Sequence, residues 1–168
     1  MDSLLLSVRI PRDQEITAEQ AIPLIASLAR ATAHPNIFWR LLGRKPLHLA
    51  LEITCLNQEI RFVIVGPKQL DTFLRSQILA AYPLSTIEIL KDYLDEKSWP
   101  SLSLHTSALH LTSPSFYPLK TYRDFKDIDP LSALLGVMSK ATQNEAMTLQ
   151  IILAPPGTAY AKGAVRAL

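Results

Sequence analysis

The sequence predicts an α+β fold whose first part, residues 3–91, follows the order β-α-β-β-α-β of the ferredoxin-like, or split βαβ, arrangement. Two observations lead to this fold class. In the run from Leu47 to Leu90, two stretches of alternating apolar residues meet at a short polar turn, as in a β-hairpin. Each half of the unit also holds a stretch of helical periodicity between two strand-like runs. Right-handed crossovers would place both helices on one face of a four-stranded antiparallel sheet.

Apolar periodicity predicts the first strand and the first helix. The strand is an alternating run from Leu4 to Ile10. Thr17 and Gln20 have the spacing of a capping box, which opens a helix. That helix should end before Pro35, since the residue before a proline avoids the helical region. Its expected buried face comprises Ala21, Ile22, Ile25, Leu28, Ala29 and Thr32.

The second and third strands are predicted to form a hairpin, closed by the short segment 56–59. One face of the second strand holds Leu47, Leu49, Leu51, Ile53 and Cys55. We expect Cys55, the single cysteine, to be buried, since free cysteine behaves as a small hydrophobe. The third strand is apolar on both faces, and Phe62 is expected in the core with Ile60 and Ile64.

Pro67 suits the first position of a second helix, because proline cannot donate a backbone hydrogen bond. Its apolar stripe comprises Leu70, Phe73, Leu74, Gln77, Ile78 and Ala81. Pro83 should end this helix, and Ile87 with Ile89 indicates the fourth strand.

A β-α-β segment is predicted over residues 100–156, either as a half-repeat that forms a second half-domain or as an extension of the first sheet. Its parts are a strand-like stretch from Leu102 to Leu111, a helix opening at Asp129 and Pro130, and a strand from Met147 to Leu153. The predicted domain boundaries are therefore 1–92 for the ferredoxin-like domain and 100–156 for this segment. Residues 157–168 read as the start of a helix that we expect to continue beyond the sequence given.

Composition excludes several classes of protein. Hydrophobic residues make up 48% and charged residues 19% of the 168 positions, which suits a globular chain with a sizeable core. A net charge of +2 gives no strong attraction to nucleic acid or to a membrane. No apolar run approaches the roughly 18 residues of a membrane span, and the N-terminus lacks the pattern of a secretory signal. The cytoplasm is the expected location.

Chemistry-bearing motifs are missing from the sequence. None of the five glycines precedes Lys-Ser or Lys-Thr at the spacing of a phosphate-binding loop. Four scattered histidines and one cysteine do not make a metal-ligand cluster, and no pattern resembles a nucleophile elbow or a catalytic dyad. We therefore expect neither an enzymatic activity nor a bound cofactor or metal in this chain.

Two charged segments are candidates for an interaction surface, with ordinary solvated loops as the competing interpretation. Residues 36–46 are too apolar for a free loop and carry a small basic cluster, and the loop KTYRDFKDID carries charges of both signs. Direct nucleic-acid binding is not expected, because a stacking platform needs two or more exposed aromatic residues. The candidate surface residues are Phe38, Trp39, Arg40, Arg44, Lys45, Lys120 and Arg123.

Three stretches resemble a known family when taken in order: EIRFVIVGPKQLDTFLRSQILAAYP, PLKTYRDF and DIDPLSALLGVMSKATQNEAMTLQIILAPP. They are similar to the N-terminal, non-ATPase region of large bacterial proteins of the type IV secretion or conjugative DNA-transfer ATPase class, common in candidate-phyla bacteria. The similarity spans roughly Leu4 to Leu168. Its most specific parts are the segment 76–83 and the helix start at Asp129, followed by the strand at Gln150.

The resemblance implies a C-terminal, RecA-like motor domain outside this chain and an N-terminal region that serves in assembly or docking. The implied partners are that motor and secretion-system proteins, and self-association would suit a motor that acts as a ring. The location would be cytoplasmic, with peripheral contact at the inner face of the cell membrane. The alternative is a free-standing ferredoxin-like module that binds a small ligand or single-stranded nucleic acid.

Overall fold

The computed structural model describes residues 3–13, 17–32, 47–93, 103–113, 117, 119–125 and 129–154. The chain divides into two compact units. The first unit comprises Met1–Lys91 and Asp129–Pro155, and the second comprises Asp92–Ile128 and Pro156–Leu168.

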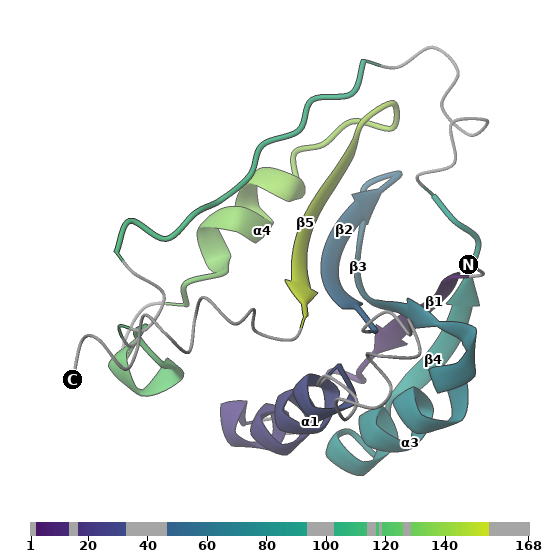
Figure 1. Ribbon diagram of the computed structural model, residues 1–168. Helices are drawn as coiled ribbons and strands as arrows, with labels where there is room; N and C mark the ends of the chain where they lie inside the picture. Colours follow the sequence, from purple (N-terminus) through teal and green to yellow (C-terminus); the bar gives the residue numbers. More distant parts are fainter. Residues whose placement is uncertain are drawn as a thin grey trace, which may run out of the picture. The chain divides into compact units, whose positions relative to one another are not determined.

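The first unit is built on a five-stranded antiparallel sheet with the strand order β4-β1-β3-β2-β5 (Figure 1). From β1 to β4 the elements follow the order β-α-β-β-α-β, as predicted. The strands are β1 (Ser3–Arg9), β2 (Leu49–Leu56), β3 (Glu59–Pro67), β4 (Thr86–Leu90) and β5 (Ala146–Leu153). The helices are α1 (Ala18–Ala31), α3 (Asp71–Ala81) and α4 (Ser132–Met138), with short 3-10 turns η1 (Lys68–Leu70) and η3 (Tyr122–Asp124).

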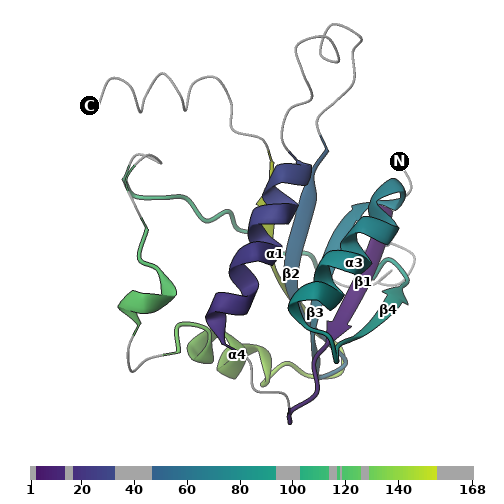
Figure 2. The same ribbon diagram turned by 90° about the horizontal axis from the view of Figure 1, so that it is seen from below.

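Helices α1 and α3 lie side by side on one face of the sheet (Figure 2). This helix-bearing face receives every second residue of each strand, because successive side chains of a strand point to opposite faces. The buried cluster between sheet and helices consists of Leu4, Leu6, Leu24, Leu28, Leu49, Ile64, Leu74 and Ile78. The α3 stripe is confirmed, since Leu74 and Ile78 are buried and Leu70, Phe73 and Ala81 pack against them.

Two core predictions were wrong in detail. In α1 the buried residues are Leu24 and Leu28, whereas Ile22 and Ile25 are exposed. Helix α1 carries two overlapping apolar stripes, and contact with the sheet and α3 determines which of the two is buried. Phe62 is 49% exposed although it alternates with buried Ile64, because burial along a strand depends on how far the helices cover it.

The hairpin between β2 and β3 closes through a two-residue turn at Asn57 and Gln58. Both residues have positive φ, 50° and 66°, as a type I′ turn requires. Such a turn matches the right-handed twist of the flanking strands. It fixes the register in which Cys55 lies opposite Ile60, and Cys55 is fully buried, as predicted.

The second helix starts later than predicted. Pro67 is extended (φ −70°, ψ 143°) and pairs with Ser3 as the last residue of β3. The turn η1 follows, and α3 begins only at Asp71, whose carboxylate accepts a hydrogen bond from Nε of Arg75 at 2.6 Å. Proline suits the end of this strand equally well, so its presence alone did not locate the helix start.

Within the predicted segment 100–156, the described residues bear on the strand from Leu102 to Leu111 and on the strand from Met147 to Leu153. Residues 103–113 form no regular element, and Leu104 and Leu109 are 82% and 84% exposed. Their alternation is compatible with a strand, yet a strand also needs a pairing partner, and none is present in the part of the chain described. Residues 129–154 belong to the first unit, where β5 pairs with β2 and adds one strand to the sheet, as in the alternative of a sheet extension. The helix predicted at 157–168 lies outside the described residues.

Helix α4 packs at the hairpin end of the sheet, on the same face as Cys55. Its Met138 is buried together with Cys55 and Ala141, and Leu134 and Met147 pack against them. The turn before the helix is closed by Asp129, whose carboxylate accepts the backbone N–H of Leu131 at 2.9 Å. The helix signal at Asp129 therefore marks the turn that leads into α4.

Gly66 is predicted to be a packing requirement of the core. A Cβ added there would lie 2.5 Å from Cδ2 of Leu49, a side chain that is 1% exposed. We expect Gly66→Ala to destabilise the fold by about 1–3 kcal/mol through overpacking. Gly136 in α4 has nothing within 4 Å of an added Cβ, so Gly136→Ala should stabilise by about 0.5–1 kcal/mol. Urea unfolding of both variants tests this, and equal effects would contradict it.

Gln58 is predicted to strain the hairpin turn, because its Cβ opposes a positive φ. Gln58→Gly should raise the free energy of unfolding by roughly 1 kcal/mol, since Asn-Gly is the favoured type I′ pair. Gln58→Ala keeps the Cβ and should leave stability unchanged. Thermal midpoints of the three proteins decide the point, and a stabilising Gln58→Ala would show that the side chain beyond Cβ is the cause.

Candidate functional site

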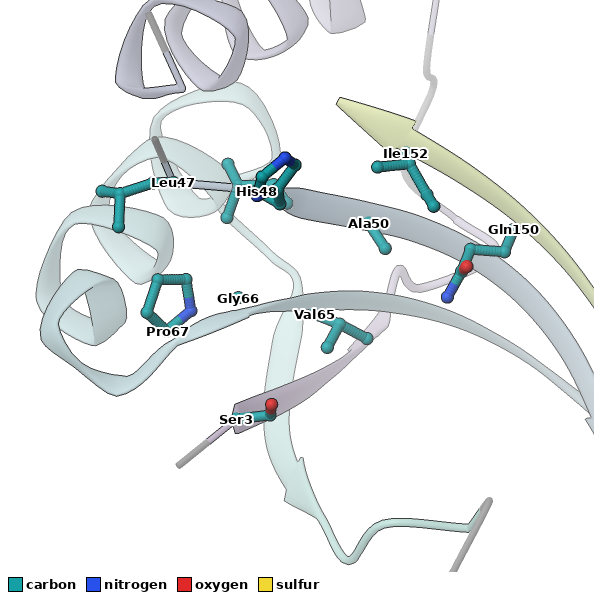
Figure 3. Close-up of a pocket in the computed structure, with 10 residues that line it drawn as sticks. Ser3, Leu47, His48, Ala50, Val65, Gly66, Pro67, Gln150 and Ile152 are labelled. Carbon is teal, nitrogen blue, oxygen red and sulfur yellow. The ribbon is translucent and has the colours of Figure 1, made fainter. Parts of the chain in front are cut away.

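A pocket of about 240 Å³ lies at one end of the sheet in the first unit. Figure 3 shows its lining residues, which come from the start of β1 and β2 and from the last residues of β3 and β5. Its polar side chains are Ser3, His48 and Gln150, and Ala50, Val65 and Ile152 contribute much of its apolar surface.

The chemistry available in this pocket is limited to hydrogen bonding and apolar contact. Ser3, His48 and Gln150 can each donate and accept hydrogen bonds. Among the described residues that line the pocket, none is a carboxylate, a lysine or an arginine. The volume lies somewhat below the roughly 300–1,000 Å³ of typical ligand pockets. The pocket can therefore take a small, mostly apolar molecule, and it offers no acid–base pair.

A row of buried polar side chains lies next to the pocket on the face opposite α1 and α3. Glu52 and Thr54 of β2 are buried, and Ser7 of β1 shares their face. Nε2 of Gln150 donates to Oε1 of Glu52 at 2.5 Å, and the hydroxyls of Thr54 and Thr148 are 2.9 Å apart. These bonds tie β5 to β2 through side chains as well as through the backbone.

In the sequence, His48, Ala50, Glu52 and Thr54 alternate with apolar residues, a pattern typical of a solvent-facing side of a strand, yet Glu52 and Thr54 are buried. The available signal was the matching pair Thr148 and Gln150, two residues apart on another strand. That signal can be used only once the pairing of β2 with β5 is known.

An exposed ionic cluster lies where the β2–β3 hairpin meets the end of β1. Glu59 accepts hydrogen bonds from Arg61 at 2.7 Å and from Arg9 at 2.9 Å. The hydrogen bond from Arg61, with the positive charges of Arg61 and Arg9, holds the pKa of Glu59 below its ordinary value of 4.5. The cluster links β1 to β3 near solvent.

Of the predicted surface residues, the structure describes only Lys120 and Arg123, both exposed in the second unit. Lys120 precedes the turn η3 and Arg123 lies within it, and Thr121 and Asp124 close this turn with a reciprocal capping box. The backbone N–H and hydroxyl of Thr121 donate to Asp124 and lower the pKa of its carboxyl, with a smaller effect from Lys120. Nε of Arg123 donates to the hydroxyl of Tyr122 at 3.0 Å.

The capping box accounts for the positions of Thr121 and Asp124 by local structure alone, and the Lys120 and Arg123 side chains stay exposed beside it. The other five surface candidates, Phe38, Trp39, Arg40, Arg44 and Lys45, lie outside the described residues.

Metal-binding groups and membrane-spanning helices were considered for the described residues alone. Among them, no three His, Cys, Asp or Glu side chains are grouped so that they could hold a metal ion. No helix in the described ranges is long and apolar enough to cross a membrane.

Large apolar side chains are exposed at both edges of the sheet and along the second unit. At the edges these are Leu84 and Ile89 near β4, Ile151 and Ile152 of β5, and Val137 of α4. In the second unit they are Leu104, Leu109, Leu111, Tyr117 and Leu119.

Comparison with known proteins gives no family for this chain. No protein-family model matches it, and neither a curated protein nor a solved structure is similar enough to count as a match.

The Glu59 cluster is predicted to make stability depend on pH in mild acid. The unfolded chain binds more protons than the folded chain below the ordinary value of 4.5, so stability is gained as pH rises. The stabilisation from the Glu59 cluster is present above the ordinary pKa of Glu59. It is lost as the pH falls through the lowered pKa that Glu59 has in the folded state. It should stay below about 1 kcal/mol, because water screens exposed ion pairs.

Urea unfolding from about pH 3 to about pH 6 tests this dependence. Glu59→Gln should be less stable than the wild type at the upper end of the range and equal to it at the lower end. Arg61→Gln should flatten the profile more than Arg9→Gln, because the hydrogen bond from Arg61 has the largest effect. A wild-type advantage that is the same at every pH would contradict the prediction.

Proposed function

We propose that this chain is a non-catalytic docking domain of a larger type IV secretion or conjugative DNA-transfer ATPase. The proposal rests on the resemblance of the stretches 59–83, 118–125 and 127–156 to the N-terminal region of such proteins. In it, the chain binds its own motor domain and secretion-system proteins through protein–protein contacts, in the cytoplasm or at the inner face of the membrane.

We also propose that the fold is ferredoxin-like, with β5 as an added strand. The pairing pattern supports this. β1 and β2 are joined by α1 and run parallel, because each is antiparallel to the inserted β3. β3 and β4 are joined by α3 and run parallel with β1 between them. Two interleaved βαβ units of this kind define the split arrangement.

The observation that carries the docking function is the exposed apolar segment in the second unit. Leu104 and Leu109 are almost fully exposed on a stretch with no regular structure, and Leu111 and Leu119 are also exposed. Leaving several leucines in water costs roughly 1.5–3 kcal/mol each compared with burial. A partner that covers them would recover that free energy, which is how a docking segment gains affinity.

A module that binds a small ligand or single-stranded nucleic acid is the alternative, and the pocket at His48 and Gln150 favours the small ligand. Titration of the chain with a labelled oligonucleotide separates the two forms of this alternative. Binding that weakens steeply with salt would favour nucleic acid.

The docking function predicts that the gene continues into a motor with a phosphate-binding loop, and that the separately expressed motor binds this chain. Binding measured by calorimetry should weaken at least tenfold in the double variant L104S/L109S, because two apolar anchors are lost. L84S serves as the matched control, since Leu84 is also well exposed but lies in the first unit. A downstream sequence without such a motor, or equal loss with L84S, would overturn the proposal.

A further inference from the structure

Strand β5 is the last strand at one edge of the sheet in the part of the chain that the structure describes. It pairs with β2 on its inner side, and in the described ranges no strand pairs with its outer side. A strand in this position presents a row of backbone N–H and C=O groups to whatever extended chain approaches it.

The two edges of the sheet differ in how they are protected. β4 has five residues, includes the exposed Glu88, and is followed by Lys91. Short length and charge are the usual devices that prevent an edge from pairing with another chain. β5 has eight residues, AMTLQIIL, and none of them is charged. The β5 edge therefore lacks the protection that the β4 edge has.

An apolar row crosses the sheet on the helix-bearing face and ends open at β5. In register, Leu6 lies opposite Ile64, Ile64 opposite Leu51, and Leu51 opposite Ile151. Leu6 and Ile64 are buried and Leu51 is half-buried, whereas Ile151 is 55% exposed. Burial thus decreases toward the edge, and a further strand beside β5 would continue the row and cover Ile151.

A second copy of β5 fits this position. In a two-fold pairing centred on Ile151, Ile151 faces its own copy, and Leu149 and Leu153 face each other across the axis. Directly opposed residues share a face of the sheet, so all of these side chains join the helix-bearing face. Gln150 and Ile152 would meet on the opposite face. No like charges meet between the two β5 strands, because the strand carries no charge.

We propose that two copies of this chain associate through antiparallel pairing of their β5 strands, centred on Ile151, to give one continuous ten-stranded sheet. A two-fold axis perpendicular to the sheet keeps the helices of both copies on the same side. The interface is isologous, so each substitution in β5 acts twice. This association does not depend on the docking function proposed above, which involves the second unit.

Charge at the centre of the pairing gives the first test. I151K places two like charges opposite each other, which destabilises a strand pair, so it should raise the dimer dissociation constant at least tenfold in sedimentation equilibrium. I151E should do the same, and an equimolar mixture of the two variants should restore association as a heterodimer. I89K, on the β4 edge where Ile89 is 64% exposed, should leave the dimer unchanged.

Several outcomes of this experiment would overturn the proposal. These are a wild-type chain that stays monomeric up to its solubility limit, an I151K variant that is folded by circular dichroism yet dimerises normally, or a loss of association in I89K equal to that in I151K. Pairing of β5 only with an extended peptide from another protein, with no self-association, would also overturn it.

Disulfide trapping tests the register independently of stability. In the proposed pairing the two Cα atoms of residue 151 lie about 4.5–5.5 Å apart, within the range of a disulfide. I151C should therefore form a covalent dimer under mild oxidation. T148C should not, because the two positions are six residues apart in register, about 20 Å. The wild type should stay uncrosslinked, since Cys55 is buried. Trapping by T148C in preference to I151C would refute the register.

Discussion

The apolar layer between the sheet and helices α1 and α3 is the interaction on which the rest of the first unit depends. The fully buried residues of this layer are Leu6, Leu28, Leu74 and Ile78. The layer also requires a close approach of β3 to β2 at Gly66, because Leu49 occupies the space that a side chain at Gly66 would need. β1 and β3 lie at the centre of this layer. Packing against the helices therefore fixes the positions of the strands, and the strands in turn form the sheet edges, the pocket and the polar row on the opposite face.

The two faces of the sheet have different chemistry as a consequence. The helix-bearing face is apolar and continues from α1 and α3 to α4, where Met138 covers Cys55. The opposite face holds Glu52 and Thr54, which are buried and bonded to β5 by Gln150 and Thr148. Buried polar groups need such partners. The polar row therefore helps to explain why β5 stays attached to β2, although β5 also carries exposed apolar residues.

The candidate surfaces lie where the apolar packing described above ends. At β5 an apolar row reaches the sheet edge at Ile151, which is 55% exposed, and in the second unit leucines are exposed along residues 103–113, which form no regular element. Both features suit contact with protein chains better than chemistry on a small molecule. The pocket at His48 and Gln150 is compatible with a small ligand, and its described lining residues offer hydrogen bonding and apolar contact. The docking function proposed above is compatible with these exposed surfaces.

Local pattern in the sequence determined the order of the elements from β1 to β4, the hairpin at Asn57 and Gln58, the α3 stripe and the burial of Cys55. Each depends on contacts between residues close in the chain or on strict periodicity. Tertiary structure alone decided the buried side of α1, the exposure of Phe62 and the pairing of β5 with β2, since these depend on partners distant in sequence. The alternation at Leu104–Leu111 shows the same limit, because a strand exists only when a neighbour completes its hydrogen bonds.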